Sequence, residues 1–214
     1  ALIPLSYILG NPAININIVL IIIYGLFANR MSVFKIKYLF FDKLIFGFFL
    51  ISVLSFLINS FESQKIEEYY FLKTFTFLRY LLLYCVLRFY FDMKKIDFSL
   101  FLISCSILVS FVCLDLFYQL LFGQDIFGHP IKHYKLSGPF GEELIAGSYL
   151  QRFAPFLFIS IIIFFKKQFI RNGIVLASII IVFGALLTSG NRMPTLLFLL
   201  MLFLASLRLV QFRK

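Results

Sequence analysis

The sequence contains few charged residues for its length. Charged residues make up 14% of the chain and hydrophobic residues 62%, whereas a typical soluble domain has about 25% charged and about 45–50% apolar residues. A water-soluble fold would leave much of this apolar surface exposed to water. The composition therefore excludes a soluble domain and indicates a membrane protein.

Several motifs that mark enzymes and metal sites are absent. The three cysteines, Cys85, Cys105 and Cys113, lie in apolar blocks without CxxC spacing, which argues against a disulfide framework and a zinc site. There is no Ser-His-Asp order, P-loop or dinucleotide glycine fingerprint. His129 and His133 are four residues apart, but the proline and glycines around them argue against a helix that would align them as metal ligands. We expect neither a metal nor a cofactor.

The apolar residues recur in blocks of roughly 17–25 residues, the length needed to cross about 30 Å of hydrocarbon. The first apolar run, residues 1–9, is too short to span and lacks the basic region of a signal peptide, so we interpret it as part of a span. The predicted fold class is all-α, a polytopic transmembrane bundle of about seven spans plus an N-terminal partial span. We expect the spans at residues 12–28, 41–60, 70–91, 98–122, 144–165, 173–189 and 194–210.

The formal net charge of +10 raises the question of nucleic-acid binding, because basic chains bind phosphate polymers. Most of the lysines and arginines, however, lie in every second connection between the apolar blocks. This alternation is typical of membrane proteins, in which basic connections face the cytoplasm. It predicts no nucleic-acid partner, and it places residues 61–69, 123–143 and 189–193 on the opposite side of the membrane.

Three charged residues lie deep within the predicted spans, away from the span ends. Arg79, Asp115 and Arg152 each lie about seven or eight residues below the outer end of a span, which corresponds to a depth of roughly 10–12 Å. Gln119 and Gln151 lie within about a turn of the same level. Charges at such depth are costly and often functional. We expect the three to converge, either as a structural Arg–Asp pair or as a site for an anionic ligand such as a diphosphate.

The connection over residues 123–143 is rich in glycine and ends with Glu142 and Glu143. Glycines permit tight turns and close approach of the backbone to a ligand. The two glutamates are candidates for acid–base chemistry. Near the start of a helix they would equally interact favourably with the helix dipole, and the sequence leaves both interpretations open.

Two segments resemble a known family. Residues 137–150 (Ser-Gly-Pro-Phe-Gly-Glu-Glu-Leu-Ile-Ala-Gly-Ser-Tyr-Leu) lead into Arg152 and Pro155, and one span later residues 188–192 read Thr-Ser-Gly-Asn-Arg. Together they resemble the O-antigen ligase and polymerase superfamily of bacterial envelope proteins. In that family a Gly-x-Phe turn followed by a helix precedes a Ser-x-x-Arg signature at an outer helix start.

This resemblance implies metal-independent transfer of a glycan from undecaprenyl diphosphate to a sugar acceptor, lipid A core or a growing chain, at the periplasmic face of the bacterial inner membrane. Basic residues would bind the diphosphate. Arg192 matches the Ser-x-x-Arg signature, Arg152 matches the arginine after the Gly-x-Phe helix, and Arg79 matches by position only. Asp115, Gln119 and Gln151 would support them. Members of the family carry a further periplasmic loop with arginine and histidine, so residues 1–214 are expected to be a single transmembrane domain, the N-terminal portion of a longer protein.

Two other functions remain open from the sequence. In a transporter or flippase, charges within the spans would form a path for a substrate or for protons, but such proteins usually show repeated halves, and no internal repeat is evident. In a non-catalytic assembly subunit, the same charges would only hold helices together.

Overall fold

The computed structural model describes residues 2–35, 38–62, 68–93, 97–131 and 135–211, and in these ranges it contains helices and no strand. Two short 3-10 turns, η1 (Arg30–Phe34) and η2 (Gly138–Phe140), lie between helices. The α-helices are α1 (Ile3–Ile8), α2 (Asn11–Asn29), α3 (Phe40–Glu62), α4 (Glu68–Asp92), α5 (Phe98–Phe122), α6 (Ala146–Phe164), α7 (Gln168–Thr188) and α8 (Arg192–Gln211).

The all-α expectation is confirmed, and each predicted span falls on one long helix. The largest boundary error is at α7, which was expected to begin at residue 173 and begins at Gln168. The expected start at residue 173 was wrong, because Asn172 and Gly173 lie inside α7. A glycine in a helix interior costs only about 1 kcal/mol relative to alanine, which a long apolar segment easily overcomes.

Four of the described helices, α2, α5, α6 and α7, are long and apolar enough to cross a membrane. Helix α8 contains a shorter apolar stretch, Arg192–Leu207. The chain is therefore a helical membrane protein. The further spans expected at α3, α4 and α8 stay predictions.

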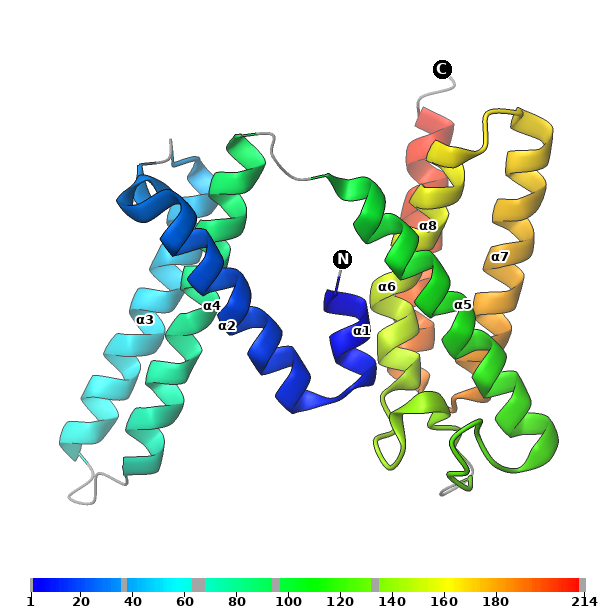
Figure 1. Cartoon of the computed structure of the whole chain (residues 1–214), viewed down its shortest axis with the longest axis horizontal. Helices are drawn as coiled ribbons and strands as arrows, with labels where there is room; N and C mark the ends of the chain where they lie inside the picture. Colours follow the sequence, from blue (N-terminus) through cyan, green and yellow to red (C-terminus); the bar gives the residue numbers. More distant parts are fainter. Residues whose placement is uncertain (1, 36–37, 63–67, 94–96, 132–134, 212–214) are drawn as a thin grey trace. The chain divides into compact units, whose positions relative to one another are not determined.

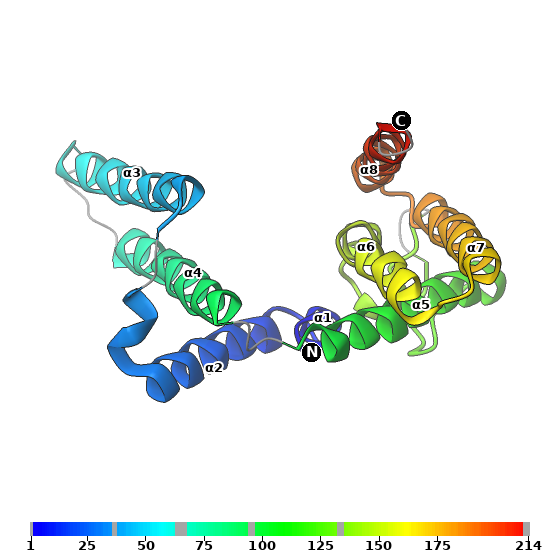
Figure 2. The ribbon, with the colours of Figure 1, turned by 90° about the horizontal axis from the view of Figure 1, so that it is seen from above.

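The chain divides into two compact units, residues 1–14 with 97–214 and residues 15–96. In the first unit α6 packs against α5, α7 and α8 (Figures 1 and 2). Its buried side chains recur at helical spacing, as expected for the centre of a bundle: Tyr149, Leu150, Phe153, Ala154, Leu157, Phe158 and Ile161.

Helix α1 belongs to this first unit. The Tyr7 ring lies 5.5 Å from the Phe153 ring, edge to face, and the Tyr149 hydroxyl donates to the Pro4 carbonyl over 3.3 Å. The helix ends before Gly10, whose φ of 93° turns the chain into α2. The N-terminal apolar run is thus a short helix packed on the bundle.

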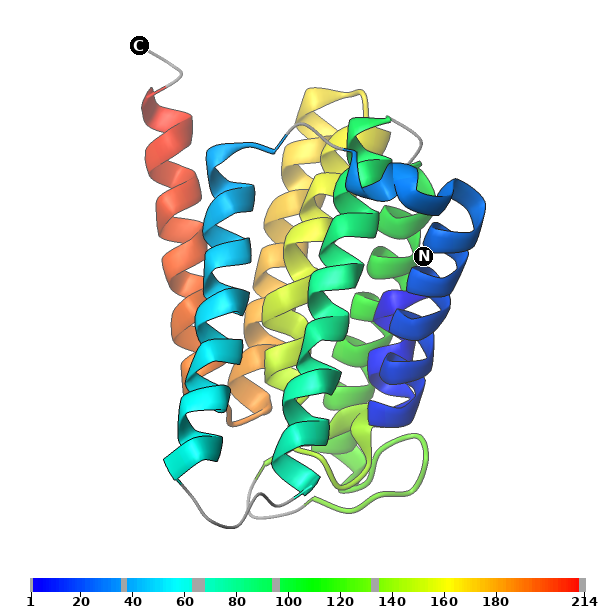
Figure 3. The ribbon, with the colours of Figure 1, turned by 90° about the vertical axis from the view of Figure 1, so that its left-hand side faces the viewer.

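In the second unit α3 and α4 are antiparallel and lie side by side (Figures 1 and 3). Asp42, on the first turn of α3, is almost fully buried. Its carboxylate accepts hydrogen bonds from the Leu39 amide (2.6 Å), the Tyr84 hydroxyl and Arg88 Nε (3.4 Å). These contacts connect the start of α3 to the end of α4. Gly25 of α2 leaves room for Val86, because a Cβ at Gly25 would overlap a Val86 methyl carbon.

Candidate functional site

In the first unit α5 and α7 end, and α6 and α8 begin, at the same end of the bundle (Figure 1). The candidate residues of this unit belong to these helix ends and to the loop between α5 and α6. Helix α5 ends in a left-handed residue, Gly123 (φ 79°), whose amide donates to the Gln119 carbonyl. Glycine favours this conformation at helix ends. The chain then turns back, and the Ile131 amide donates to the Gly123 carbonyl over 3.2 Å.

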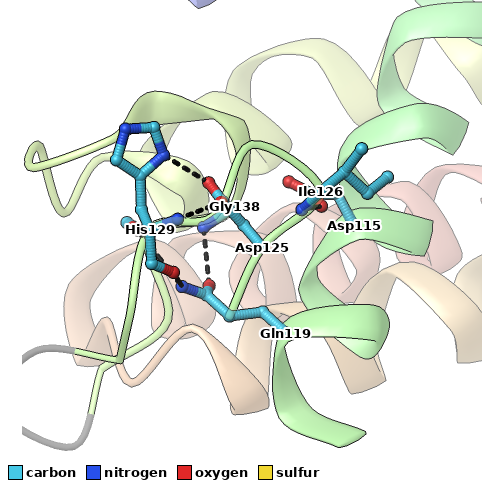
Figure 4. A network of polar contacts seen from close by, with 7 residues as sticks. Asp115, Gln119, Asp125, Ile126, His129 and Gly138 are labelled. Atoms are coloured by element: carbon cyan, nitrogen blue, oxygen red, sulfur yellow. Dashed lines mark hydrogen bonds and ion pairs between the residues drawn. The ribbon is translucent and has the colours of Figure 1, made fainter. Parts of the chain in front are cut away.

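Asp115 anchors this returning loop to α5. It is fully buried, and its Oδ1 accepts a hydrogen bond of 2.9 Å from the Ile126 amide (Figure 4). Asp115 lies seven residues before the end of α5, a rise of roughly 10 Å, so the loop folds back along the helix to this level. Its Oδ2 is buried and has no hydrogen-bond partner among the described residues.

Gln119, one turn further along α5, joins two separate parts of the loop. Its Oε1 accepts from the Gly138 amide over 2.9 Å, and its Nε2 donates to the His129 carbonyl (3.2 Å) and lies 3.5 Å from Ser137 Oγ (Figure 4). Gln119 is fully buried. Both the oxygen and the nitrogen of this buried amide have hydrogen-bond partners, which holds the neighbouring groups in place. Gln119 therefore supports the loop.

Asp125 and His129 contact each other through their side chains within the loop. Asp125 Oδ2 lies 2.9 Å from His129 Nδ1, and Asp125 Oδ1 accepts from the His129 amide over 2.6 Å (Figure 4). The Asp125 side chain is inaccessible to solvent, whereas that of His129 is 44% exposed. The other ring nitrogen, Nε2, lies 3.4 Å from the position that a Cβ would occupy at Gly141.

Two glycines of the 137–150 segment have conformations that explain their presence. Gly138 has φ 56° and Gly141 has φ 63°, values that residues with a side chain rarely adopt. A Cβ at Gly138 would also lie 3.3 Å from Leu116 of α5. Between them Phe140 packs against Tyr149, with ring centroids 5.2 Å apart. The Gly-x-Phe turn is therefore required by packing against α5 and α6.

The two segments that carry the family resemblance are in direct contact. A Cβ at Gly147 of α6 would lie 2.7 Å from Ser189 Oγ and 2.8 Å from Asn191 Cβ, so only glycine lets the turn between α7 and α8 approach α6 this closely. Asn191 Nδ2 donates to the Leu144 carbonyl over 3.1 Å. Ser189 is fully buried, and its Oγ donates to the Leu186 carbonyl.

Beside this contact lies an open hollow of about 470 Å³ lined by Lys135, Ser148, Gly190, Asn191, Arg192, Met193 and Pro194. It contains two cationic side chains, Lys135 from the loop and Arg192 at the first position of α8. A hydroxyl, an amide and two cations around one depression suit an anionic ligand, because charge-assisted hydrogen bonds are the strongest available to oxyanions. Arg192 also lines a second, more apolar hollow with Leu186, Leu187, Thr195 and Leu196.

Two of the other predicted residues, Arg152 and Gln151, do not line this hollow. Arg152 is exposed on α6 and Gln151 is half-buried. Arg152 has no ion pair with any described residue, so Asp115 and Arg152 do not form the Arg–Asp pair considered from the sequence.

Arg79 belongs to the second unit, and its convergence with Asp115 and Arg152 stays a prediction. On α4, an Arg79 terminal nitrogen donates to the Tyr80 hydroxyl over 3.1 Å and the guanidinium carbon lies 5.0 Å from the centre of the Tyr80 ring. Its Nε is buried and has no partner among the described residues.

Glu142 and Glu143 are exposed and precede α6, which begins at Ala146. The first turn of α6 contains no acidic residue. The Glu143 amide donates to the Phe140 carbonyl over 3.2 Å. Their catalytic role stays a prediction. His133 lies outside the described residues.

Sequence reasoning missed three features of this structure: the Asp125–His129 pair, the participation of Lys135, and the Asp42 cluster of the second unit. Asp125 and His129 are four residues apart, but the intervening glycine hid their proximity, because no helix was expected there. The Asp42 cluster had a usable signal. Asp42 starts one predicted span and Arg88 ends the next, so antiparallel spans bring them to the same level.

Comparison of the chain with protein-family models, with curated proteins and with solved structures found no match.

Proposed function

We propose that this protein transfers a glycan from an undecaprenyl-diphosphate carrier to a sugar acceptor at the periplasmic face of the bacterial inner membrane, as a metal-independent ligase or polymerase. The acceptor would be lipid A core or a nascent polysaccharide. The single observation that carries the proposal is the hollow shared by Lys135 and Arg192, formed where the two resembling segments meet at Gly147 and Asn191.

A diphosphate concentrates negative charge, and the hollow offers two cations with a hydroxyl and an amide beside them. Arginine contacts phosphate oxygens with two parallel hydrogen bonds, whereas lysine acts as a point charge. Departure of the diphosphate places further negative charge on its oxygens, so cations held in advance would also lower the barrier to transfer. In this proposal Arg192 is the main ligand of the diphosphate, Lys135 the second, and Arg152 a further cation of the same unit.

The test is glycan transfer in a knockout strain complemented with the full-length gene carrying Arg192→Ala, Arg192→Lys, Lys135→Ala or Arg152→Ala. We expect Arg192→Ala to abolish transfer at normal membrane abundance, Arg192→Lys to restore little of it, and Lys135→Ala to reduce it by about tenfold or more. The matched control is Lys166→Ala, an exposed cation just after the opposite end of α6. Normal transfer by both Arg192→Ala and Lys135→Ala would contradict the proposal.

A further inference from the structure

We propose that His129, oriented by Asp125, is the base that accepts the proton of the acceptor hydroxyl during glycan transfer. The inference rests on the proposed function and assigns a residue to the chemical step. It comes from one structural arrangement, in which a fully buried carboxylate holds one nitrogen of a half-exposed imidazole.

The arrangement fixes which ring nitrogen is available. A carboxylate oxygen only accepts hydrogen bonds, so in the 2.9 Å contact with Asp125 Oδ2 the hydrogen is on His129 Nδ1. The lone pair of the neutral ring is then on Nε2. A carboxylate that holds Nδ1–H in this way also stabilises the imidazolium that forms when Nε2 takes a proton.

The ring contact is not needed to close the loop. The loop is already closed through main-chain groups, since the Asp125 amide donates to the His129 carbonyl (3.0 Å) and the Gly128 amide to the Asp125 carbonyl (3.0 Å). Gln119 donates to the same His129 carbonyl, and Asp125 Oδ1 holds the His129 amide. Asp125 Oδ2 is therefore free to bind the imidazole. Closing the loop does not require this second contact.

Two routes through the loop link the pair with residues that line the hollow. His129 Nε2 lies over Gly141, and three residues later the Leu144 carbonyl accepts from Asn191, which lines the hollow next to Arg192. On the other side, Gln119 bonds both the His129 carbonyl and the Gly138 amide, three residues after Lys135. The loop that carries His129 follows the end of α5, and Arg192 begins α8 at the same end of the first unit (Figure 1).

The proposed step balances as follows. The acceptor hydroxyl loses its proton to His129 Nε2, and its oxygen forms a bond to the anomeric carbon of the donor sugar. The bond between that carbon and the diphosphate oxygen breaks, and its electron pair leaves with the diphosphate, held by Arg192 and Lys135. The imidazolium then returns its proton to water. A positioned base of this kind contributes typically about 10²–10⁴-fold to a rate.

The experiment measures transfer in membranes that contain the full-length protein with His129→Ala, in the presence and absence of added imidazole. We expect a loss of about 10²–10⁴-fold, with added imidazole restoring transfer by about tenfold or more, because a free base can occupy the vacated space. Asp125→Asn should reduce transfer by a similar factor. An amide NH2 opposite Nδ1 favours the tautomer with its hydrogen on Nε2, and in that tautomer Nε2 has no lone pair to accept a proton. Arg192→Ala membranes, in which imidazole should restore nothing, are the matched control.

Each result decides the inference. Normal transfer by His129→Ala would overturn it, while loss of transfer in Arg192→Ala and Lys135→Ala would leave the proposed function standing. Loss in His129→Ala without rescue by imidazole would also overturn the role as a base and assign the pair to holding the loop. Normal transfer by Arg192→Ala and Lys135→Ala would instead contradict the proposed function itself.

Discussion

Gly147 of α6 and Ser189 at the end of α7 approach so closely that a Cβ on Gly147 would lie 2.7 Å from Ser189 Oγ. A real Cβ does not come this close to a fixed oxygen. Ser189 is fully buried and bonded to the Leu186 carbonyl, so it has little freedom to move aside. The contact therefore fixes the position of the turn that presents Asn191 and Arg192.

Replacing Gly147 by alanine should separate α6 from this turn. We expect Gly147→Ala to lower the free energy of unfolding by about 1–3 kcal/mol, the usual effect of an added methyl group in a packed interior. The matched control is Gly173→Ala in α7, where nothing lies within 4 Å of the added Cβ. That change should stabilise the helix by about 0.5–1 kcal/mol. Thermal unfolding of the purified protein in detergent measures both, and an equal effect of the two substitutions would contradict the close contact.

Asp115 should protect the Ile126 amide from exchange with solvent. Asp115→Ala removes the acceptor of this 2.9 Å hydrogen bond and leaves a donor unpaired, at a cost of about 1–3 kcal/mol. Asp115→Asn keeps an oxygen in the same place and should retain most of the protection. Hydrogen–deuterium exchange of residues 124–131 measures the difference, and equal exchange in wild type and Asp115→Ala would show that the loop does not depend on this bond.

Asp42 should couple the start of α3 to the end of α4. Asp42→Asn weakens the bonds from Tyr84 and Arg88, and Tyr84→Phe removes one of them. Because both changes affect one contact, their costs should be non-additive, with a coupling free energy of about 0.5–3 kcal/mol in a double-mutant cycle. Unfolding of the two single variants and the double variant measures it. Simple addition would indicate that the contact contributes nothing.

The charge pattern predicts which connections face outward. Single cysteines placed at Asn59, Lys132 and Asn191 should react with a membrane-impermeant reagent in intact cells, and a cysteine at Lys94 should react only after permeabilisation. The control is the same labelling in inverted vesicles, where the order should reverse. Protection of position 132 together with labelling of position 94 would overturn the topology.

Asp97 offers a small test of helix capping outside the spans. Its carboxylate accepts from the Ser99 amide over 2.8 Å at the start of α5, and this bond holds the pKa of Asp97 below its usual value. The capping contribution is present while the carboxylate is ionised and is lost as the pH falls through the lowered pKa. We expect Asp97→Ala to destabilise α5 at neutral pH by about 0.5–2 kcal/mol. Asp97→Ser keeps a capping oxygen, so it should retain most of the stability at neutral pH. It should remove only the loss of stability that follows protonation of Asp97 at low pH.

The sequence by itself determined the helices of this protein and the positions of its long apolar segments. This was possible because crossing about 30 Å of hydrocarbon needs a long run of apolar residues and leaves the backbone no alternative to a helix. The positions of lysine and arginine along the sequence likewise indicated the alternation of basic connections. The sequence also marked Asp115 and Gln119 as unusual, because polar groups within an apolar helix stand out in any sequence.

The tertiary structure alone decided what these polar residues do. From the sequence Asp115 was expected either in an Arg–Asp pair or beside an anionic ligand; in the structure it accepts the Ile126 amide, while Gln119 joins His129 to Gly138. Both outcomes depend on a loop that folds back along α5, and the path of a loop is set by a few glycine conformations and by contacts between distant residues. The presence of Lys135 and Arg192 around one hollow and the approach of Gly147 to Ser189 have the same origin. Residues far apart in the chain become neighbours only when the helices pack, and hydrophobic periodicity carries no information about such pairs.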